Sequence, residues 1–140
     1  MELLLPVIDE DSGPFWEAAR RGELVMQGCA DCGRLRFPPR PMCPYCQSVD
    51  VTWTPMSGRG TVWSFVVPHP PLLPAYAEQA PYNVVVVALE EDPTLRLVGN
   101  LVTSADGAIN ELLDISIGAP VRVVFAEVSD DVSLPRWVPT

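Results

Sequence analysis

Four cysteines in two pairs constrain this chain more than any other feature of its sequence. Cys29 and Cys32 form one Cys-x-x-Cys pair, ten residues intervene, and Cys43 and Cys46 form the second pair. Each such turn places two sulfur atoms on one side, so two facing turns can surround a metal ion tetrahedrally. The spacing predicts one Zn²⁺ per chain, with iron in a rubredoxin-like site as the alternative. Because four thiolates leave no coordination position for water or substrate, we expect the metal to be structural.

The length and hydropathy of the chain indicate one small cytoplasmic protein. Its 140 residues suffice for one compact domain with a small appendage. No apolar run reaches the about 18 residues of a membrane span. The opening residues, Met1–Pro6, lack the basic start and long apolar run of a secretory signal. In the cytoplasm thiols stay reduced, which favours metal binding over disulfides.

The charge is strongly acidic and unevenly distributed. All nine basic residues are arginines, and the net charge is −9. Residues 1–60 hold six arginines and eight acidic residues, whereas residues 61–140 hold three arginines and ten acidic residues. Because nucleic acid binding depends on cationic contacts with phosphate, this balance argues against it.

The residue pattern predicts a mainly β fold in three parts. Residues 1–26 form an N-terminal segment with a short helix at 12–22, capped by Ser12 and ended by Gly22. Residues 27–56 form a rubredoxin-like zinc ribbon, whose short strands are expected at 24–27, 34–37 and 51–54. Residues 57–140 form a five-stranded OB-fold barrel. Its β-branched strands are expected at 61–67, 82–90, 94–102, 120–128 and 132–138, with one helical turn at 110–114.

A long loop interrupts the barrel pattern at residues 68–81. It holds five prolines together with the apolar residues Leu72, Leu73 and Tyr76. Loops of this length in compact domains are usually functional, and prolines lower the entropic cost of ordering a loop against a partner. His69, the only histidine, also lies here, and no nucleophile with oriented partners can be identified beside it.

Several stretches together resemble a known family, the acyl-CoA-associated zinc-ribbon/OB-fold proteins, which were long described only as a domain of unknown function. The matching stretches run in order along nearly the whole chain: Phe15-Trp16, Gly22-Glu23-Leu24, Cys29–Gly33, Phe37–Arg40, Cys43–Cys46, Ser57–Val62, Ala80-Pro81-Tyr82 and Ile117–Val121. The resemblance implies a non-catalytic partner subunit in a hetero-oligomer. Its partner would be a thiolase-superfamily (lipid-transfer-protein-like) enzyme that acts on acyl-CoA, such as a steroid side-chain aldolase.

Two sets of residues are candidates for these contacts. For acyl-CoA we expect Arg40, Arg59, Trp63, Phe65 and His69, because arginines bind phosphates and Trp63 and Phe65 alternate on one predicted strand. An ion pair would equally explain either arginine, and barrel core would explain the two aromatic residues. For the partner enzyme we expect large apolar residues, any of which can instead belong to the core: Phe15, Trp16, Leu72, Leu73, Tyr76 and Trp137.

Three hypotheses of function follow. The first is the partner subunit that stabilises a thiolase-like enzyme and helps to form its acyl-CoA channel. The second is a stand-alone acyl-CoA hydrolase or hydratase that uses His69. The third is a nucleic-acid-binding ribbon and barrel, which would require a basic aromatic groove that the acidic barrel half disfavours.

Overall fold

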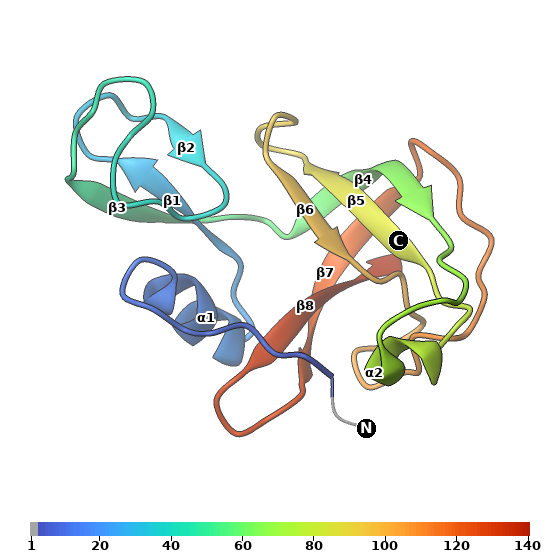
Figure 1. The fold of residues 1–140 in the computed structure, drawn as a ribbon. Helices are drawn as coiled ribbons and strands as arrows, with labels where there is room; N and C mark the ends of the chain where they lie inside the picture. The colour runs from blue at the N-terminus through green and yellow to red at the C-terminus, as the bar shows by residue number, and fades with distance from the viewer. Residues whose placement is uncertain (1–2) are drawn as a thin grey trace.

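The computed structural model of this chain describes residues 3–140, arranged as a small sheet with a helix beside a larger curled sheet (Figure 1). The elements follow in this order: α1 (Gly13–Arg20), β1 (Val25–Cys29), β2 (Leu35–Arg36), β3 (Val51–Pro55), β4 (Arg59–Val66), α2 (Pro74–Ala77), β5 (Val84–Leu89), β6 (Arg96–Gly99), β7 (Pro120–Glu127) and β8 (Ser133–Pro139). The fold is mainly β, as predicted. No helix within residues 3–140 combines the length and apolar character that crossing a membrane requires.

The small sheet packs against helix α1, and strand β1 together with the loops between its strands carries the four cysteines. Its antiparallel strands have the order β2-β1-β3, and all of β1 is buried. Helix α1 has Pro14 in its first turn and ends before Gly22, whose φ of 79° is easily reached only by glycine. The predicted cap by Ser12 is wrong, because the Ser12 hydroxyl bonds Asp9 Oδ1 at 2.9 Å instead of capping the helix.

The large sheet has the strand order β6-β5-β4-β7-β8 and curls until its two outer strands meet. The segment that follows β6 closes the gap through a parallel bridge between Leu101 and Trp137 of β8. There the Trp137 N–H donates to Asn100 O at 3.0 Å, and the Val102 N–H donates to Trp137 O at 2.8 Å. This closure makes the sheet a five-stranded OB-fold barrel.

Asn83, at the entry to β5, holds the closing segment in place. Its side-chain Nδ2 donates to Leu101 O at 2.8 Å, and its Oδ1 accepts from the Leu101 N–H at 2.6 Å. Asn83 is only 1% exposed, and an amide buried without hydrogen bonds would be costly. Its two bonds to the backbone of Leu101 remove that cost. The position of the bridge is therefore set by a side chain as well as by the strands.

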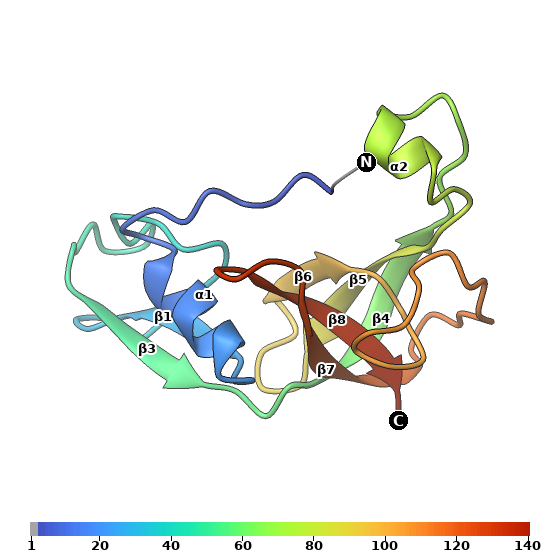
Figure 2. The same ribbon diagram turned by 90° about the horizontal axis from the view of Figure 1, so that it is seen from below.

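One apolar core joins the two sheets and the helix. It includes Phe15 of α1, Met26 of β1, Val62 of β4, Leu97 of β6 and Trp137 of β8. Figure 2 shows α1 lying between β1 and the barrel strands. The ribbon and barrel are therefore packed together rather than joined only by a linker.

Four local expectations need correction. Phe15 is 4% exposed and Trp137 is 0% exposed, so these two side chains belong to the core, which was the alternative given for them, and do not form an exposed contact surface. Residues 110–114 form no helical turn: Asn110 ends a turn, residues 111–114 have no regular secondary structure, and Leu113 packs against the core. The loop at 68–81 contains the unpredicted helix α2.

Candidate functional site

The two cysteine turns have the same backbone geometry. The Gly33 N–H donates to Cys29 O at 2.9 Å, and the Gln47 N–H donates to Cys43 O at 3.0 Å. The residue after each second cysteine is left-handed, with φ of 78° at Gly33 and 63° at Gln47. Each turn therefore curls back on itself and directs its two sulfurs towards the other turn.

The four sulfurs fit a tetrahedral metal site. Cys29 Sγ lies 3.5 Å from Cys46 Sγ, and Cys32 Sγ lies 3.7 Å from Cys43 Sγ. All four sulfurs lie within 4.8 Å of one another. Tetrahedral Zn–S bonds of about 2.3 Å require sulfurs about 3.8 Å apart, whereas a disulfide requires about 2.05 Å. The chain thus forms a four-cysteine metal-binding site.

The protonation of these thiols is uneven because they crowd one another. The Cys32 N–H, 3.4 Å from Cys29 Sγ, lowers the pKa of Cys29 to about 6. The backbone N–H of Ser48 favours the ionised form of Cys46, yet the surrounding thiols, Cys29 first among them, raise the pKa of Cys46 to about 12. Four adjacent thiolates repel one another, so a cation is needed to hold them all ionised.

Arg40 lies in a loop whose backbone is held from two sides. Its N–H donates to Gln27 Oε1 at 2.7 Å, and its carbonyl accepts from Arg36 Nη2 at 3.1 Å. Gln27 and Arg36 are buried, whereas the Arg40 residue is exposed. The predicted contact residue Arg40 is therefore presented by a fixed loop beside the metal site.

The other predicted acyl-CoA residues on strand β4 do not form one surface. Arg59 pairs with Glu90, Nε to Oε2 at 2.9 Å, as the ion-pair alternative anticipated. A bulge between Val62 and Ser64 shifts the alternation of the strand. Phe65 therefore packs against the core, whereas Trp63 is 49% exposed.

Trp63 has a cationic neighbour that the sequence pattern did not indicate. The guanidinium carbon of Arg96 lies 3.8 Å from the centre of the Trp63 ring, which is a cation–π arrangement. Predicting this contact would have required the pairing registers of β4 with β5 and of β5 with β6, which a single sequence does not give.

The long loop presents apolar groups but no catalytic arrangement. The ring Nδ1 of His69 lies 2.9 Å from Val67 O within the same loop. Leu73 is 59% exposed, whereas Leu72 and Tyr76 are half-buried and pack towards Tyr82 and Val102. Among the predicted contacts of this loop, Leu73 therefore offers the most surface.

An apolar groove of about 560 Å³ runs between the helix side and the barrel. One wall comes from Phe15, Trp16 and Phe37, and the other comes from β6 and β8, including Leu134. Two arginines, Arg96 of β6 and Arg136 of β8, are also among the residues that line this groove. Sequence reasoning gave Trp16 as a contact residue but did not indicate the groove, because its walls are distant in the sequence.

Arg136 is an unusual member of this wall because it is 8% exposed. Its Nη1 donates weakly to Ala105 O at 3.4 Å and to Gly107 O at 3.3 Å. Burial lowers the pKa of Arg136 below its ordinary value. No carboxylate is bonded to it within residues 3–140.

Two family models match the two parts of this architecture. The model of the ChsH2 rubredoxin-like zinc ribbon domain matches residues 16–52, and that of the ChsH2 C-terminal OB-fold domain matches residues 53–126. The chain belongs to the ChsH2 family. Its four cysteines are therefore those of a family zinc ribbon, and its curled sheet is the family OB-fold.

A solved structure and two relatives extend the ChsH2 likeness to almost the whole chain. The structure, "Ltp2-ChsH2(DUF35) aldolase", is 38% identical with a TM-score of 0.78 and covers 96% of this chain and 98% of that one. A probable enoyl-CoA hydratase alpha subunit of Thermomonospora curvata is 40% identical over 96% of this chain and 39% of its own. A 3-oxo-4,17-pregnadiene-20-carboxyl-CoA hydratase alpha subunit of Mycobacterium tuberculosis is 37% identical over 98% of this chain and 40% of its own length. The chain thus spans about two fifths of the length of these two relatives.

Proposed function

We propose that this chain is a non-catalytic partner subunit of a thiolase-like enzyme that cleaves carbon–carbon bonds of acyl-CoA thioesters in steroid side-chain degradation. The observation that carries the proposal is the 38% identity, over 98% of the matched chain, to a structure named as an Ltp2-ChsH2 aldolase. A relative named for a steroid-CoA substrate supports the substrate class. The domain boundaries at residues 27 and 57, one within the ribbon strand β1 and one between β3 and β4, form part of this proposal.

In this proposal one Zn²⁺ per chain stabilises the ribbon and takes no part in chemistry. Cys29, Cys32, Cys43 and Cys46 would hold it, and their sulfur distances support a closed tetrahedral shell. Such a shell offers no position to a substrate oxygen. The catalytic groups would then belong to the partner enzyme.

The apolar groove supports a role in the passage of the acyl group. Its walls are mainly apolar, and two arginines, Arg96 and Arg136, are among the lining residues. An acyl-CoA thioester would suit this lining, because its acyl group is apolar and its carrier bears phosphates that arginines bind. Arg40 is exposed and fixed by its backbone, so it remains our candidate for a phosphate contact, with Arg59, Trp63, Phe65 and His69 as weaker ones.

The partner would contact the exposed apolar groups that remain outside the core. Leu73 and the half-buried residues Trp16, Leu72 and Tyr76 are candidates, and the proline-rich loop around Leu73 would lose little entropy on binding. In this proposal the acyl-CoA residues and the partner residues both lie on the surface of the small subunit.

Affinity capture with the tagged chain, followed by mass spectrometry, tests this function. We expect a thiolase-superfamily enzyme at near-equal stoichiometry, cleavage of a steroid acyl-CoA by the complex, and no turnover by the isolated chain. Capture should survive in His69→Ala. Turnover by the isolated chain that His69→Ala abolishes would instead establish the hydrolase or hydratase alternative.

A further inference from the structure

The segment before helix α1 exposes several apolar side chains to solvent. Val7 is 87% exposed, Leu4 is 64% exposed and Ile8 is 41% exposed. None of residues 3–8 belongs to a helix or strand, and no backbone–backbone hydrogen bond joins them to the rest of the described chain. Figure 2 shows this segment running along the outside of the molecule. Contiguous exposed apolar groups of this kind typically mark a contact surface.

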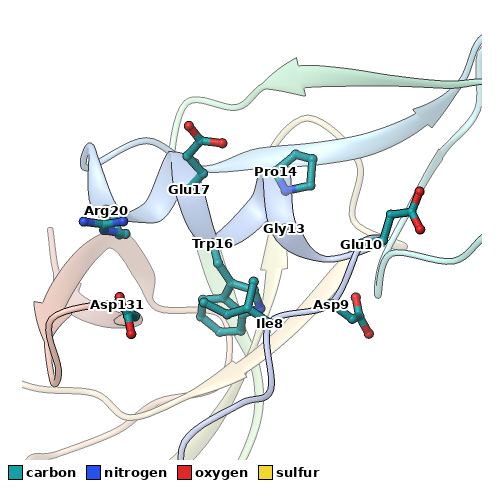
Figure 3. A pocket seen from close by; sticks show the side chains of 9 residues that line it. All are labelled: Ile8, Asp9, Glu10, Gly13, Pro14, Trp16, Glu17, Arg20 and Asp131. Carbon is teal, nitrogen blue, oxygen red and sulfur yellow. The ribbon is translucent and has the colours of Figure 1, made fainter.

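The same segment borders a hollow against α1. The hollow has a volume of about 590 Å³, and Ile8 and the half-buried Trp16 form its apolar centre. Figure 3 shows the Trp16 ring and Ile8 between Asp131 on one side and Asp9 and Glu10 on the other. An apolar centre with a polar border is the usual anatomy of a protein interface.

The border of the hollow is acidic. Asp9, Glu10, Glu17 and Asp131 line it, together with one cation, Arg20. Across residues 3–26 the chain holds five acidic residues and two arginines, and the whole chain has no lysine. A second copy of this chain would set acids against acids, and an anionic lipid surface would be repelled in the same way.

We propose that residues 3–8 and the Trp16 hollow dock the thiolase-like partner, through a partner surface that offers an apolar side chain bordered by arginine or lysine. This inference rests on the proposed function and names the surface that this function uses. The apolar contacts would determine how long the complex persists. The acidic border would speed association and make it sensitive to salt.

Two double variants test the two parts of the surface. Val7→Asp with Ile8→Asp places charges in the apolar segment, and Glu10→Gln with Asp131→Asn removes two of the four negative charges of the border. The control, Leu112→Asp with Ile117→Asp, changes apolar residues that are 60% and 68% exposed elsewhere on the molecule. Circular dichroism and Tm verify that each variant is folded.

The measurement is the association and dissociation of each full-length variant with the purified thiolase-superfamily enzyme from the affinity capture, at low and high salt. We expect Val7→Asp/Ile8→Asp to weaken binding at least about tenfold through faster dissociation. We expect Glu10→Gln/Asp131→Asn to slow association about threefold and to reduce its salt dependence. The control should stay within about twofold of the unaltered chain.

The outcomes separate this inference from the proposed function. If the unaltered chain binds and Val7→Asp/Ile8→Asp binds within twofold of it, the docking surface is wrong while the subunit role stands. If the unaltered chain binds no thiolase-superfamily enzyme, both are wrong. Association of the chain with itself or with anionic vesicles, lost in Val7→Asp/Ile8→Asp, would also overturn the inference.

Discussion

The residue that follows each Cys-x-x-Cys turn has a positive φ, and the two turns meet this demand differently. The first turn uses Gly33 and the second uses Gln47. A left-handed conformation costs a non-glycine residue about 1–2 kcal/mol. A glycine directly after a cysteine pair suits a sharp turn, so the sequence alone explains why Gly33 stands at this position. The positive φ of Gln47 could not be predicted, because a glutamine side chain does not indicate a left-handed backbone.

Gly33→Ala should therefore destabilise the metal site through the backbone alone. A Cβ at Gly33 would meet no atom within 4 Å, so strain at φ of 78° is the whole effect. We expect a loss of about 1 kcal/mol in the free energy of unfolding of the metal-loaded chain. Urea unfolding measures it, with Gly13→Ala in helix α1 as the control, since Gly13 has equal space and an ordinary φ. Equal stabilities of the two variants would contradict this account.

At the scale of elements, the sequence predicted the strands well and their faces less well. All five barrel strands were predicted, because β-branched residues dominate them and turn residues separate them. The bulge near Trp63 was not predictable, since it depends on how β4 pairs with β5. The closeness of β6 to β8, which forms one wall of the apolar groove, likewise depends on tertiary pairing and could not be predicted.

The small sheet should depend on its metal in a pH-dependent manner. The metal needs thiolates, so protons compete with it, and affinity falls as pH falls. The pKa of Cys29 is lowered to about 6, whereas that of Cys46 is raised to about 12, so protons compete with the metal for at least one ligand throughout this range. We therefore expect metal-linked stability to decline as pH falls and to be lost most steeply below about pH 6. Metal released to a coloured chelator between pH 4 and 8 measures this dependence. Unchanged retention at pH 4 would contradict it.

At the scale of the whole molecule, the ribbon and barrel share a core through Phe15. Its ring centre lies 5.0 Å from that of Trp16 and 5.6 Å from that of Phe37, and Phe15 is 4% exposed. Because Phe15 and Trp16 are adjacent in the sequence, one face of a short helix cannot bury both. Only the packed structure shows that Phe15 faces inward and Trp16 lies at the border of two hollows.

Phe15→Ala should therefore destabilise both parts in one transition. We expect a loss of about 3–5 kcal/mol, which corresponds to a fall in Tm of about 10–17 °C for a chain of this size. Metal release and barrel unfolding should coincide during heating. Leu112→Ala, at a residue that is 60% exposed, is the control and should leave Tm nearly unchanged. Two separate transitions in Phe15→Ala would show that the parts unfold independently.

The closure of the barrel has a consequence for how the native molecule fluctuates. Its two outer strands are joined by one parallel bridge with two backbone hydrogen bonds, whereas β7 and β8 pair along seven residues of each. Local opening follows the least-bonded boundary, so the barrel should part between β6 and β8 long before it unfolds. We expect the amide protons of Trp137 and Val102 to exchange with deuterium faster than those at the centre of β5, although all three regions are buried. Equal exchange rates would mean that the barrel opens only as a whole.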